Sequence, residues 1–446
     1  MTAAQPTISI AGGGLPKVAY GSGMHVFDAS GKRYVDGSGG PAVYCLGHGN
    51  REVNAAITAQ LDRIAHGYRY TFTSDPLEEL TALVAESCGG GLDRMVFVSG
   101  GSEAVESALK IALQYHAAKG EMTRRRFISR HRSWHGNTLG ALSISGFLER
   151  RAPYEGALIE GSLISPANVY RPPAGVAPAE VGAWCAAELE AEILRLGAEK
   201  VAAFVFEPVV GAAGGVVPAP PGYAALVRDV CDRHGVLMIA DEVMCGAGRC
   251  GTWRALEHDG VVPDIMPVAK GLGGGYLPLG ATVYHRRIGV VLDAAYGGPL
   301  TGHTFTGHTA ACAAGVAVQR IVRRDGLVGK VRRLGPVFME MLKGATQGIE
   351  AVGDIRGRGF FVGLELVADR ATKEPFAAEH KLFIRIRDAA LARGLICYPC
   401  GGNVDGVRGD TVILAPPYIA EPADLEEIAG LTAASIRAAL SEIGAG

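Results

Sequence analysis

The chain has 446 residues, which is enough for two or three domains or for one large domain with an appendage. It contains 63 glycines without a Gly-X-Y period, and 48% of its residues are hydrophobic, so a collagen and a low-complexity disordered chain are both excluded. The formal net charge of −2 gives no electrostatic basis for binding nucleic acid or an anionic membrane.

The amino-terminal segment, residues 1–65, predicts short strands and one helix. Apolar and polar residues alternate in residues 24–28 and 33–36, on either side of a Ser-Gly-Lys turn, which is typical of a β-hairpin. Residues 50–64 have the pattern of a helix. We assign this segment to the smaller of two domains.

The middle of the chain, residues 66–324, alternates strand and helix signals. Apolar runs predict strands, and apolar residues at helical spacing predict helices between them. Such alternation, with little charge in the strands, predicts an α/β domain with a mostly parallel sheet covered by helices. The strands are expected at residues 95–98, 202–206 and 236–240, and the helices at residues 103–116 and 223–234.

The remaining residues, 325–446, mix helix and strand signals and predict a smaller α+β domain. A strand is expected at residues 359–366, and helices are expected at residues 380–393 and 424–443.

The cysteines, nine in number and scattered, fit reduced thiols in a cytoplasmic protein better than a disulfide framework. Cys397 and Cys400 form a lone C-x-x-C, and without a second pair neither a metal nor a redox role is predicted. Residues 1–16 lack the basic start and the apolar stretch of a secretory signal. Residues 208–227 carry no charge, but their prolines and glycines argue against a membrane span.

A first candidate site is the run Phe97-Val-Ser-Gly-Gly-Ser-Glu-Ala104, where a strand ends, two glycines turn and a helix begins. The first N–H groups of a helix are unpaired and favour an anion, so Gly101 and Ser102 could bind a phosphate. An ordinary strand–turn–helix junction with Ser102 as the helix cap has the same pattern. The run is neither a P-loop nor a dinucleotide fingerprint.

Two charged residues follow other apolar runs. Asp241 is expected at the carboxyl end of a strand, where open α/β sheets place ligand-binding groups, although an acid there can also cap the next turn. Lys270 lies between an apolar run and a glycine cluster. Desolvation there would lower its pKa and make it a nucleophile able to form a Schiff base; a solvated loop lysine is the alternative.

Two further motifs complete the set. Trp134, in Ser133-Trp-His-Gly136, could stack on a planar cofactor or pack in the core. The loop Gly302-His-Thr-Phe-Thr-Gly-His308 offers hydroxyls for a phosphate or is simply a polar loop. A phosphate site, a stacking aromatic, a strand-end acid and a buried lysine are together what pyridoxal 5′-phosphate (PLP) requires, because this cofactor needs a lysine Schiff base and an acidic partner for its ring nitrogen.

The sequence resembles the class-III (ω-amino-acid type) PLP-dependent aminotransferases over nearly the whole chain. This resemblance implies PLP-dependent transferase fold type I, with a large domain around a mostly parallel sheet and a smaller α+β domain, and a homodimer with shared active sites. The segments that carry it are Val26-Phe-Asp28, Ser99-Gly-Gly-Ser-Glu-Ala104, Ser133-Trp-His-Gly136, Phe206-Glu-Pro-Val209, Ala240-Asp-Glu-Val243 with Gly246-Ala-Gly-Arg249, and Ala269-Lys-Gly271.

The resemblance implies three chemical roles. Lys270 would form the Schiff base with PLP and carry a proton of the substrate, and Asp241 would pair with the pyridinium nitrogen of the cofactor. Glu207 is similar to an acid that the family places near the cofactor ring. No metal is implied.

The resemblance also implies which residues hold the cofactor. Gly101 and Ser102 would bind its phosphate, together with Thr304 from the neighbouring subunit. Trp134 would stack on one face of the ring, where the family usually has tyrosine, and Val243 would pack on the other face.

The motifs indicate less clearly which residues contact the substrate. Arg408 is the candidate for reading a substrate carboxylate, with a surface loop arginine as the alternative, because residues 400–407 are a glycine-rich insertion beside it. Tyr44 and Tyr70, and with them Tyr68, are aromatic candidates for the pocket, and core or surface packing is the alternative for each.

The implied function is transfer of an amino group from an amine or ω-amino acid to a keto acid, pyruvate or 2-oxoglutarate, by a ping-pong mechanism. The alternatives are a PLP-dependent aminomutase, racemase or decarboxylase on the same fold, or a non-enzymatic α/β protein that keeps the scaffold.

Overall fold

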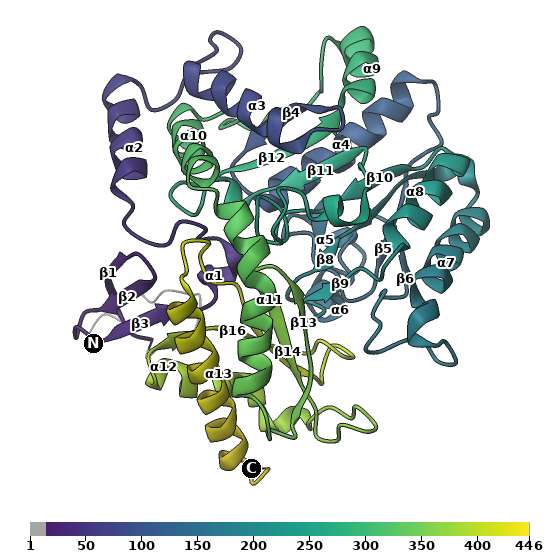
Figure 1. Cartoon of the computed structure of the whole chain (residues 1–446). Coiled ribbons are helices and arrows are strands. Elements are labelled where there is room, and N and C mark those ends of the chain that lie inside the picture. Colours follow the sequence, from purple (N-terminus) through teal and green to yellow (C-terminus); the bar gives the residue numbers. More distant parts are fainter. Residues whose placement is uncertain (1–14, 446) are drawn as a thin grey trace, which may run out of the picture.

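The computed structural model describes residues 15–445, and a seven-stranded sheet forms the centre of its larger part (Figure 1). The strand order is β4-β12-β11-β10-β7-β5-β6; β12 runs antiparallel to its neighbours β11 and β4, and the other pairs are parallel. The predicted mostly parallel sheet is thereby confirmed. Its strands are β4 (Leu92–Val98), β5 (Arg126–Arg130), β6 (Ser162–Ile164), β7 (Val201–Phe206), β10 (Leu237–Ala240), β11 (Ile265–Val268) and β12 (Gly280–His285).

Helices cover both faces of this sheet because its central strands are apolar on both sides. In β7, Ala203 and Val205 face one core cluster, whereas Phe204 and Phe206 face the opposite one. The first cluster includes α4 (Gly101–Ala118) and α9 (Arg286–Tyr296), and the second includes α7 (Val181–Leu196) and α8 (Tyr223–His234). A third cluster packs α3 (Asp75–Cys88) and α10 (Thr309–Arg324) on β4, β11 and β12.

A second, antiparallel sheet in the order β13-β14-β17-β16 forms the smaller part, with three helices packed on it (Figure 1). The predicted strand over residues 359–366 begins only at Phe361, because Gly359 has a φ of 59° and forms the turn between β13 and β14. These elements are β13 (Val352–Arg358), β14 (Phe361–Leu366), β16 (Tyr398–Gly401), β17 (Asp410–Leu414), α11 (Leu327–Ala345), α12 (Leu382–Ala392) and α13 (Pro422–Glu442).

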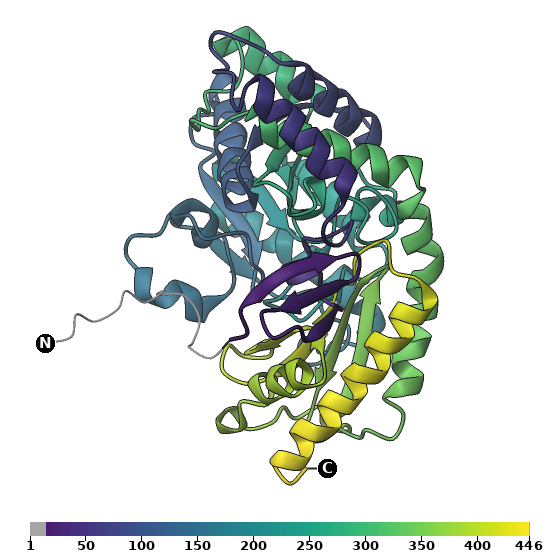
Figure 2. The ribbon, with the colours of Figure 1, turned by 90° about the vertical axis from the view of Figure 1, so that its left-hand side faces the viewer.

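The strands of the amino-terminal segment within residues 18–36 lie against this smaller part (Figure 2). The predicted hairpin is present as β2 (His25–Asp28) and β3 (Arg33–Asp36), preceded by β1 (Val18–Ser22). β3 also pairs in parallel with β15 (Leu395–Ile396), so residues from the two ends of the chain share one sheet and one core cluster. The domain boundaries at residues 65 and 324 stay a prediction.

The other elements include α1 (Gly39–Ala42), α2 (Arg51–Arg63), α5 (Leu139–Ser143), α6 (Leu148–Arg151), β8 (Val209–Val210) and β9 (Val217–Pro218). No helix within residues 15–445 is both long and apolar enough to cross a membrane.

All nine cysteines are unpaired, and seven of them are buried. Most of the stretch in which the sequence shows no secretory signal, residues 1–14, lies outside the described residues.

Candidate active site

Five strands of the large sheet, β4, β5, β7, β10 and β11, run in the same direction and end at one edge. The residues that follow them meet there in a cleft of about 400 Å³. Ligand sites of open α/β sheets form at this edge, because loops from several strands converge on it. The following residues line the cleft: Ser99, Gly101 and Ser102 after β4, Trp134 and His135 after β5, Glu207 after β7, Asp241 after β10, and Lys270 after β11.

The amino terminus of α4 offers an anion site. The amide of Ala104 makes the first intrahelical bond, to the carbonyl of Gly100, so the amides of Gly101 and Ser102 have no acceptor within the helix. Ser102 Oγ accepts a hydrogen bond from the amide of Asn137 at 3.0 Å, which leaves its own hydrogen free to donate. This end of an 18-residue helix therefore directs backbone and hydroxyl donors and the helix dipole into the cleft.

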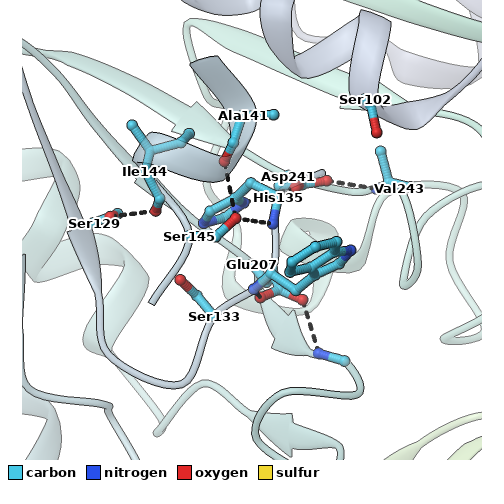
Figure 3. A network of polar contacts seen from close by, with 12 residues as sticks. Ser102, Ser129, Ser133, His135, Ala141, Ile144, Ser145, Glu207, Asp241 and Val243 are labelled. Atoms are coloured by element: carbon cyan, nitrogen blue, oxygen red, sulfur yellow. Dashed lines mark hydrogen bonds and ion pairs between the residues drawn. The ribbon is translucent and has the colours of Figure 1, made fainter. Parts of the chain in front are cut away.

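Asp241 is buried and held in one orientation by two contacts (Figure 3). Its Oδ2 lies 2.8 Å from Nδ1 of the buried His135, and its Oδ1 accepts from the amide of Val243 at 3.0 Å. The amide of His135 in turn donates to Ser145 Oγ, whose hydrogen goes to the carbonyl of Ala141. An ionised carboxylate can only accept, so a His135 ring that carries a hydrogen on Nδ1 donates it to Asp241 and holds this side chain in the cleft wall.

Glu207 is the second buried carboxyl of the site. Its Oε1 accepts from the amide of Trp134 at 3.0 Å, and its Oε2 accepts from the amide of Gly211 at 2.8 Å. Burial raises the pKa of Glu207 above its ordinary value, although both backbone contacts act in the opposite direction. Glu207 thus fixes the segment that carries Trp134 and places a buried carboxyl beside the cleft.

Lys270 follows β11 in a strained conformation. Its φ of 47° lies in the left-handed region, which costs a residue with a Cβ about 1 kcal/mol or more. Its Nζ donates to the carbonyl of Pro41 at 3.1 Å. Burial lowers the pKa of Lys270 to about 8, although Asp241 and Glu207 favour the ammonium form. The sequence pattern at Lys270 thus coincides with a strained lysine that can be neutral near physiological pH.

Trp134 and Val243 both line the cleft. A Cβ built on Gly101 would lie 2.8 Å from a methyl carbon of Val243, so α4 approaches this side chain closely only because residue 101 is glycine. The Trp134 ring meets Phe147 edge to face at 5.9 Å, and the guanidinium of Arg150 lies 4.9 Å from its centre. Both contacts fix the indole in place as a wall of the cleft.

The other predicted site residues lie outside the cleft. Tyr44 is half-buried, and its ring adjoins the position of Gly275, which lines the cleft. Tyr70 is 73% exposed, with Arg69 over its ring, and Tyr68 and Thr304 are exposed as well.

Arg408 is not brought to the cleft either. Its side chain is half-exposed and bonds to Asp405 at 2.8 Å and to Glu374 at 2.7 Å. Both partners are charged, so the guanidinium is already neutralised in this conformation. This corresponds to the surface arginine that the sequence leaves as the alternative.

Three contributions were not foreseen from the sequence. His135 stands next to Trp134 in the same motif, and its pairing with Asp241 could have been expected from the meeting of two strand ends. Pro41, which contributes its carbonyl, and residues 277–279, which line the cleft, have no charged or nucleophilic side chain. No sequence signal marks them.

The cleft has the donors and the shape that PLP requires. The end of α4 can bind a phosphate, Asp241 can bind a protonated ring nitrogen, and Trp134 and Val243 offer apolar surface to a ring in the same cleft. A Cβ on Gly136 would lie 2.8 Å from Ser102 Oγ, so the backbone itself forms the wall at the phosphate end. Lys270 supplies the amine with which the aldehyde of PLP can form a Schiff base.

Comparison with known proteins agrees with this chemistry. Residues 15–435 match the family model "Aminotransferase class-III". The chain is 44% identical over 418 residues to an uncharacterized aminotransferase of Schizosaccharomyces pombe, covering 93% of this chain and 90% of the relative. It is 40% identical over 423 residues to the uncharacterized aminotransferase YodT of Bacillus subtilis, covering 95% of both.

A solved structure is similar to this chain in both fold and sequence. The PLP-bound amine transaminase from an uncultivated Pseudomonas species has a TM-score of 0.88 with this chain at 34% identity, and the match covers 98% of both chains. The predicted fold type I is thereby confirmed.

Proposed function

The chain belongs to the class-III aminotransferase family, and on that premise we propose that it transfers an amino group from an amine or ω-amino acid to a keto acid, pyruvate or 2-oxoglutarate, by a ping-pong mechanism. Members of this family are PLP-dependent enzymes, and PLP is the cofactor of this one. The observation that supports the proposed chemistry best is the convergence of Lys270 and Asp241 on one cleft with an anion site.

PLP, when bound, supplies an aldehyde that reacts with amines and an aromatic ring that takes up electron density. Gly101 and Ser102 would hold its phosphate, and Trp134 and Val243 would hold the two faces of its ring. Asp241, oriented by His135, would keep a proton on the ring nitrogen, because a buried carboxylate stabilises a cation beside it.

Lys270 would bind the cofactor through Nζ and later serve as the base of the reaction. Its amine, once free, accepts the proton from the substrate carbon that bears the nitrogen, and it returns that proton to a neighbouring atom. This requires the neutral amine, and a pKa near 8 makes a useful fraction of it available at neutral pH. The strained backbone fixes the direction of the side chain during the transfer.

A homodimer forms part of the proposal. Thr304 lies outside the cleft of its own chain, as a residue that acts on a second subunit must. Around it, Tyr68, Tyr70, Leu300 and Phe305 are more than half exposed, an apolar surface of the kind that subunits cover. The nine free cysteines fit a reducing compartment, so we also propose a cytoplasmic location.

A donor–acceptor panel tests the proposed reaction. The purified protein with PLP is mixed with pyruvate or 2-oxoglutarate and a series of amines and ω-amino acids, and alanine or glutamate is measured. Formation of either product with at least one donor supports the proposal. A substrate that is isomerised, racemised or decarboxylated without formation of either product would instead support an aminomutase, a racemase or a decarboxylase.

Replacing Ser102 by alanine is expected to weaken PLP binding by about 10- to 100-fold, because a hydrogen bond to a charged group contributes about 1.5–3 kcal/mol. The dissociation constant is measured by titrating the cofactor-free protein with PLP. Ser107→Ala is the matched control, because this residue lies on the same helix but faces Thr301 away from the cleft. Equal affinities of the Ser102 and Ser107 variants would contradict the phosphate site.

Replacing Arg408 by alanine is expected to change KM for pyruvate and 2-oxoglutarate by less than about threefold, because its guanidinium is neutralised by Asp405 and Glu374 outside the cleft. Steady-state kinetics with both acceptors check this. A rise of KM by more than about tenfold for one acceptor would show that Arg408 leaves these partners to bind the substrate carboxylate, as the resemblance implies.

A further inference from the structure

Trp134 is supported in the cleft wall by a helix that burial does not hold in place. The ring of Phe147 meets the indole edge to face at 5.9 Å, and the guanidinium of Arg150 lies 4.9 Å from the indole centre. Phe147 directly precedes α6, and Arg150 lies within it. This helix has four residues and none of them is buried, so neither helix propensity nor apolar burial fixes its place.

A buried arginine joins α6 to the segment that carries Trp134. Arg132 precedes Trp134 by two residues, and its Nη1 and Nη2 donate to the two carboxylate oxygens of Glu149, in α6, at 3.1 and 3.2 Å. Two parallel hydrogen bonds fix the direction of such a pair as well as its distance. The Arg132 side chain is 10% exposed and that of Glu149 32%, so water screens the pair only in part. The Arg132–Glu149 pair therefore sets the place of α6 relative to Trp134.

The backbone of Arg132 is fixed at the same place. Its φ of 56° lies in the left-handed region, which a residue with a Cβ adopts only where its surroundings require it. Its amide donates at 3.0 Å to the carbonyl of Gly146, the residue before Phe147. Backbone and side chain of Arg132 thus both bind the segment that supports the indole.

The Arg132–Glu149 pair also contacts residues 402–409, which form the β16–β17 loop. Arg132 Nη1 donates to the carbonyl of Gly402 at 2.9 Å. A Cβ on Gly406 would lie 2.9 Å from a carboxylate oxygen of Glu149 and 3.3 Å from both terminal nitrogens of Arg132. The loop itself does not line the cleft. A loop of the smaller part therefore packs directly on the ion pair that places α6.

We propose that Arg132 and Glu149 are positioning residues for Trp134. Their pair, packed against the β16–β17 loop, holds α6 where its two side chains keep the indole in the cleft wall. The inference rests on the proposed role of Trp134 as a support for the PLP ring. It connects one wall of the cofactor cleft with a loop of the smaller part.

Two substitutions at Glu149 grade the loss of the pair. Glu149→Ala removes both acceptors of Arg132, and alanine is the residue most compatible with a helix. Glu149→Gln loses the charge and keeps one oxygen that can accept from Arg132, so its effect should be smaller. Glu160→Gln is the matched control, because Glu160 forms an exposed ion pair with Arg126 at the other end of β5.

A third substitution disturbs the pair from the loop. Gly406→Ala places a Cβ against the pair at a φ of 97°. Gly348→Ala is its control, because Gly348 has a φ of 77° and a Cβ there would meet nothing within 4 Å. The two variants share the backbone strain, and only the first touches the ion pair.

The place of the indole is read by fluorine NMR in the cofactor-free protein after incorporation of a fluorinated tryptophan, so the readout does not depend on turnover. The chain has three tryptophans, Trp134, Trp184 and Trp253, and Trp134→Phe assigns the resonance of interest. Trp184 and Trp253 lie outside the cleft, so their resonances report on the fold of each variant.

In Glu149→Ala and Gly406→Ala we expect the Trp134 resonance to shift and broaden, because the indole is no longer held in one place, while the other two resonances stay unchanged. Glu149→Gln should lie between Glu149→Ala and the parent, and both controls should match the parent. The dissociation constant of PLP should rise by about three- to tenfold in Glu149→Ala, since stacking on the indole is weakened.

A Trp134 resonance that stays unchanged in Glu149→Ala, or that moves equally in Gly348→Ala, would overturn the inference. Shifts of all three tryptophan resonances would also overturn it and assign the ion pair to general stability, as would an unchanged affinity for PLP. The proposed function is tested separately: a moved resonance in a protein that transfers no amino group refutes the function, and an unmoved resonance in an active aminotransferase refutes the inference.

Discussion

Lys270→Ala will abolish amine transfer, lowering kcat/KM by at least about 10⁴-fold. General-base catalysis alone contributes about 10²–10⁴-fold, and the variant also loses the covalent attachment of the cofactor. The structure offers no substitute: Lys270 is the one lysine among the residues that line the described cleft. Steady-state kinetics at saturating PLP measure the loss.

The matched control for this prediction is Lys110→Ala. Lys110 is exposed on α4, so its loss removes one lysine without touching the cleft, and activity should remain within about twofold of the parent. A Lys270→Ala protein that keeps PLP and loses less than about tenfold in kcat/KM would exclude Lys270 as the base.

Asp241→Asn is expected to lower kcat by about 10³-fold while the cofactor remains attached to Lys270. The neutral amide cannot stabilise a positive charge on the ring nitrogen as a carboxylate does, although its oxygen can still accept the hydrogen bond from His135. Attachment depends on Lys270 and not on the acid, so borohydride labelling of Lys270 should persist.

The control for this second prediction is Asp229→Asn on the exposed face of α8, which should leave kcat unchanged. Asp241→Glu should retain more activity than Asp241→Asn, because it preserves the charge. If asparagine and glutamate at position 241 reduce kcat equally, the position of the carboxyl matters and its charge does not.

The residues at the strand ends were predictable because the sequence shows both the apolar run of each strand and the polar residue that follows it. Val201–Phe206 and Leu237–Ala240 are uninterrupted apolar runs, and a polar residue that follows such a run comes to lie at the carboxyl edge of the sheet. Asp241 and Lys270 are of this kind. The helix after Ser99 also begins within two residues of its expected start, because the glycines mark the turn.

Contacts between distant segments could not be predicted in this way. β12 inserts antiparallel between β4 and β11, and β3 pairs with β15 across almost the whole chain; neither pairing has a signal in the local pattern. The same holds for the hydrogen bond between Lys270 and Pro41 and for the ion pair between Arg408 and Glu374. Each joins residues that only the folded chain brings together.

The cleft explains part of the high glycine content of the chain, 63 of 446 residues. Gly101, Gly136 and Gly211 each occupy a place where a Cβ would lie less than 3.0 Å from a neighbouring side chain. Those neighbours are Val243, Ser102 and Met244, all of which line the cleft. Close approach of the backbone to this site therefore accounts for part of the unusual composition.

The central claim is that PLP bound at Lys270 carries the amino group from donor to acceptor. The most direct test reduces the PLP-bound protein with borohydride and maps the labelled peptide, before and after addition of an active donor in the absence of keto acid. We predict a label on Lys270 before the donor is added, and loss of that label together with release of pyridoxamine phosphate afterwards. A label on another residue, or a Lys270 label that no donor removes, would contradict the account.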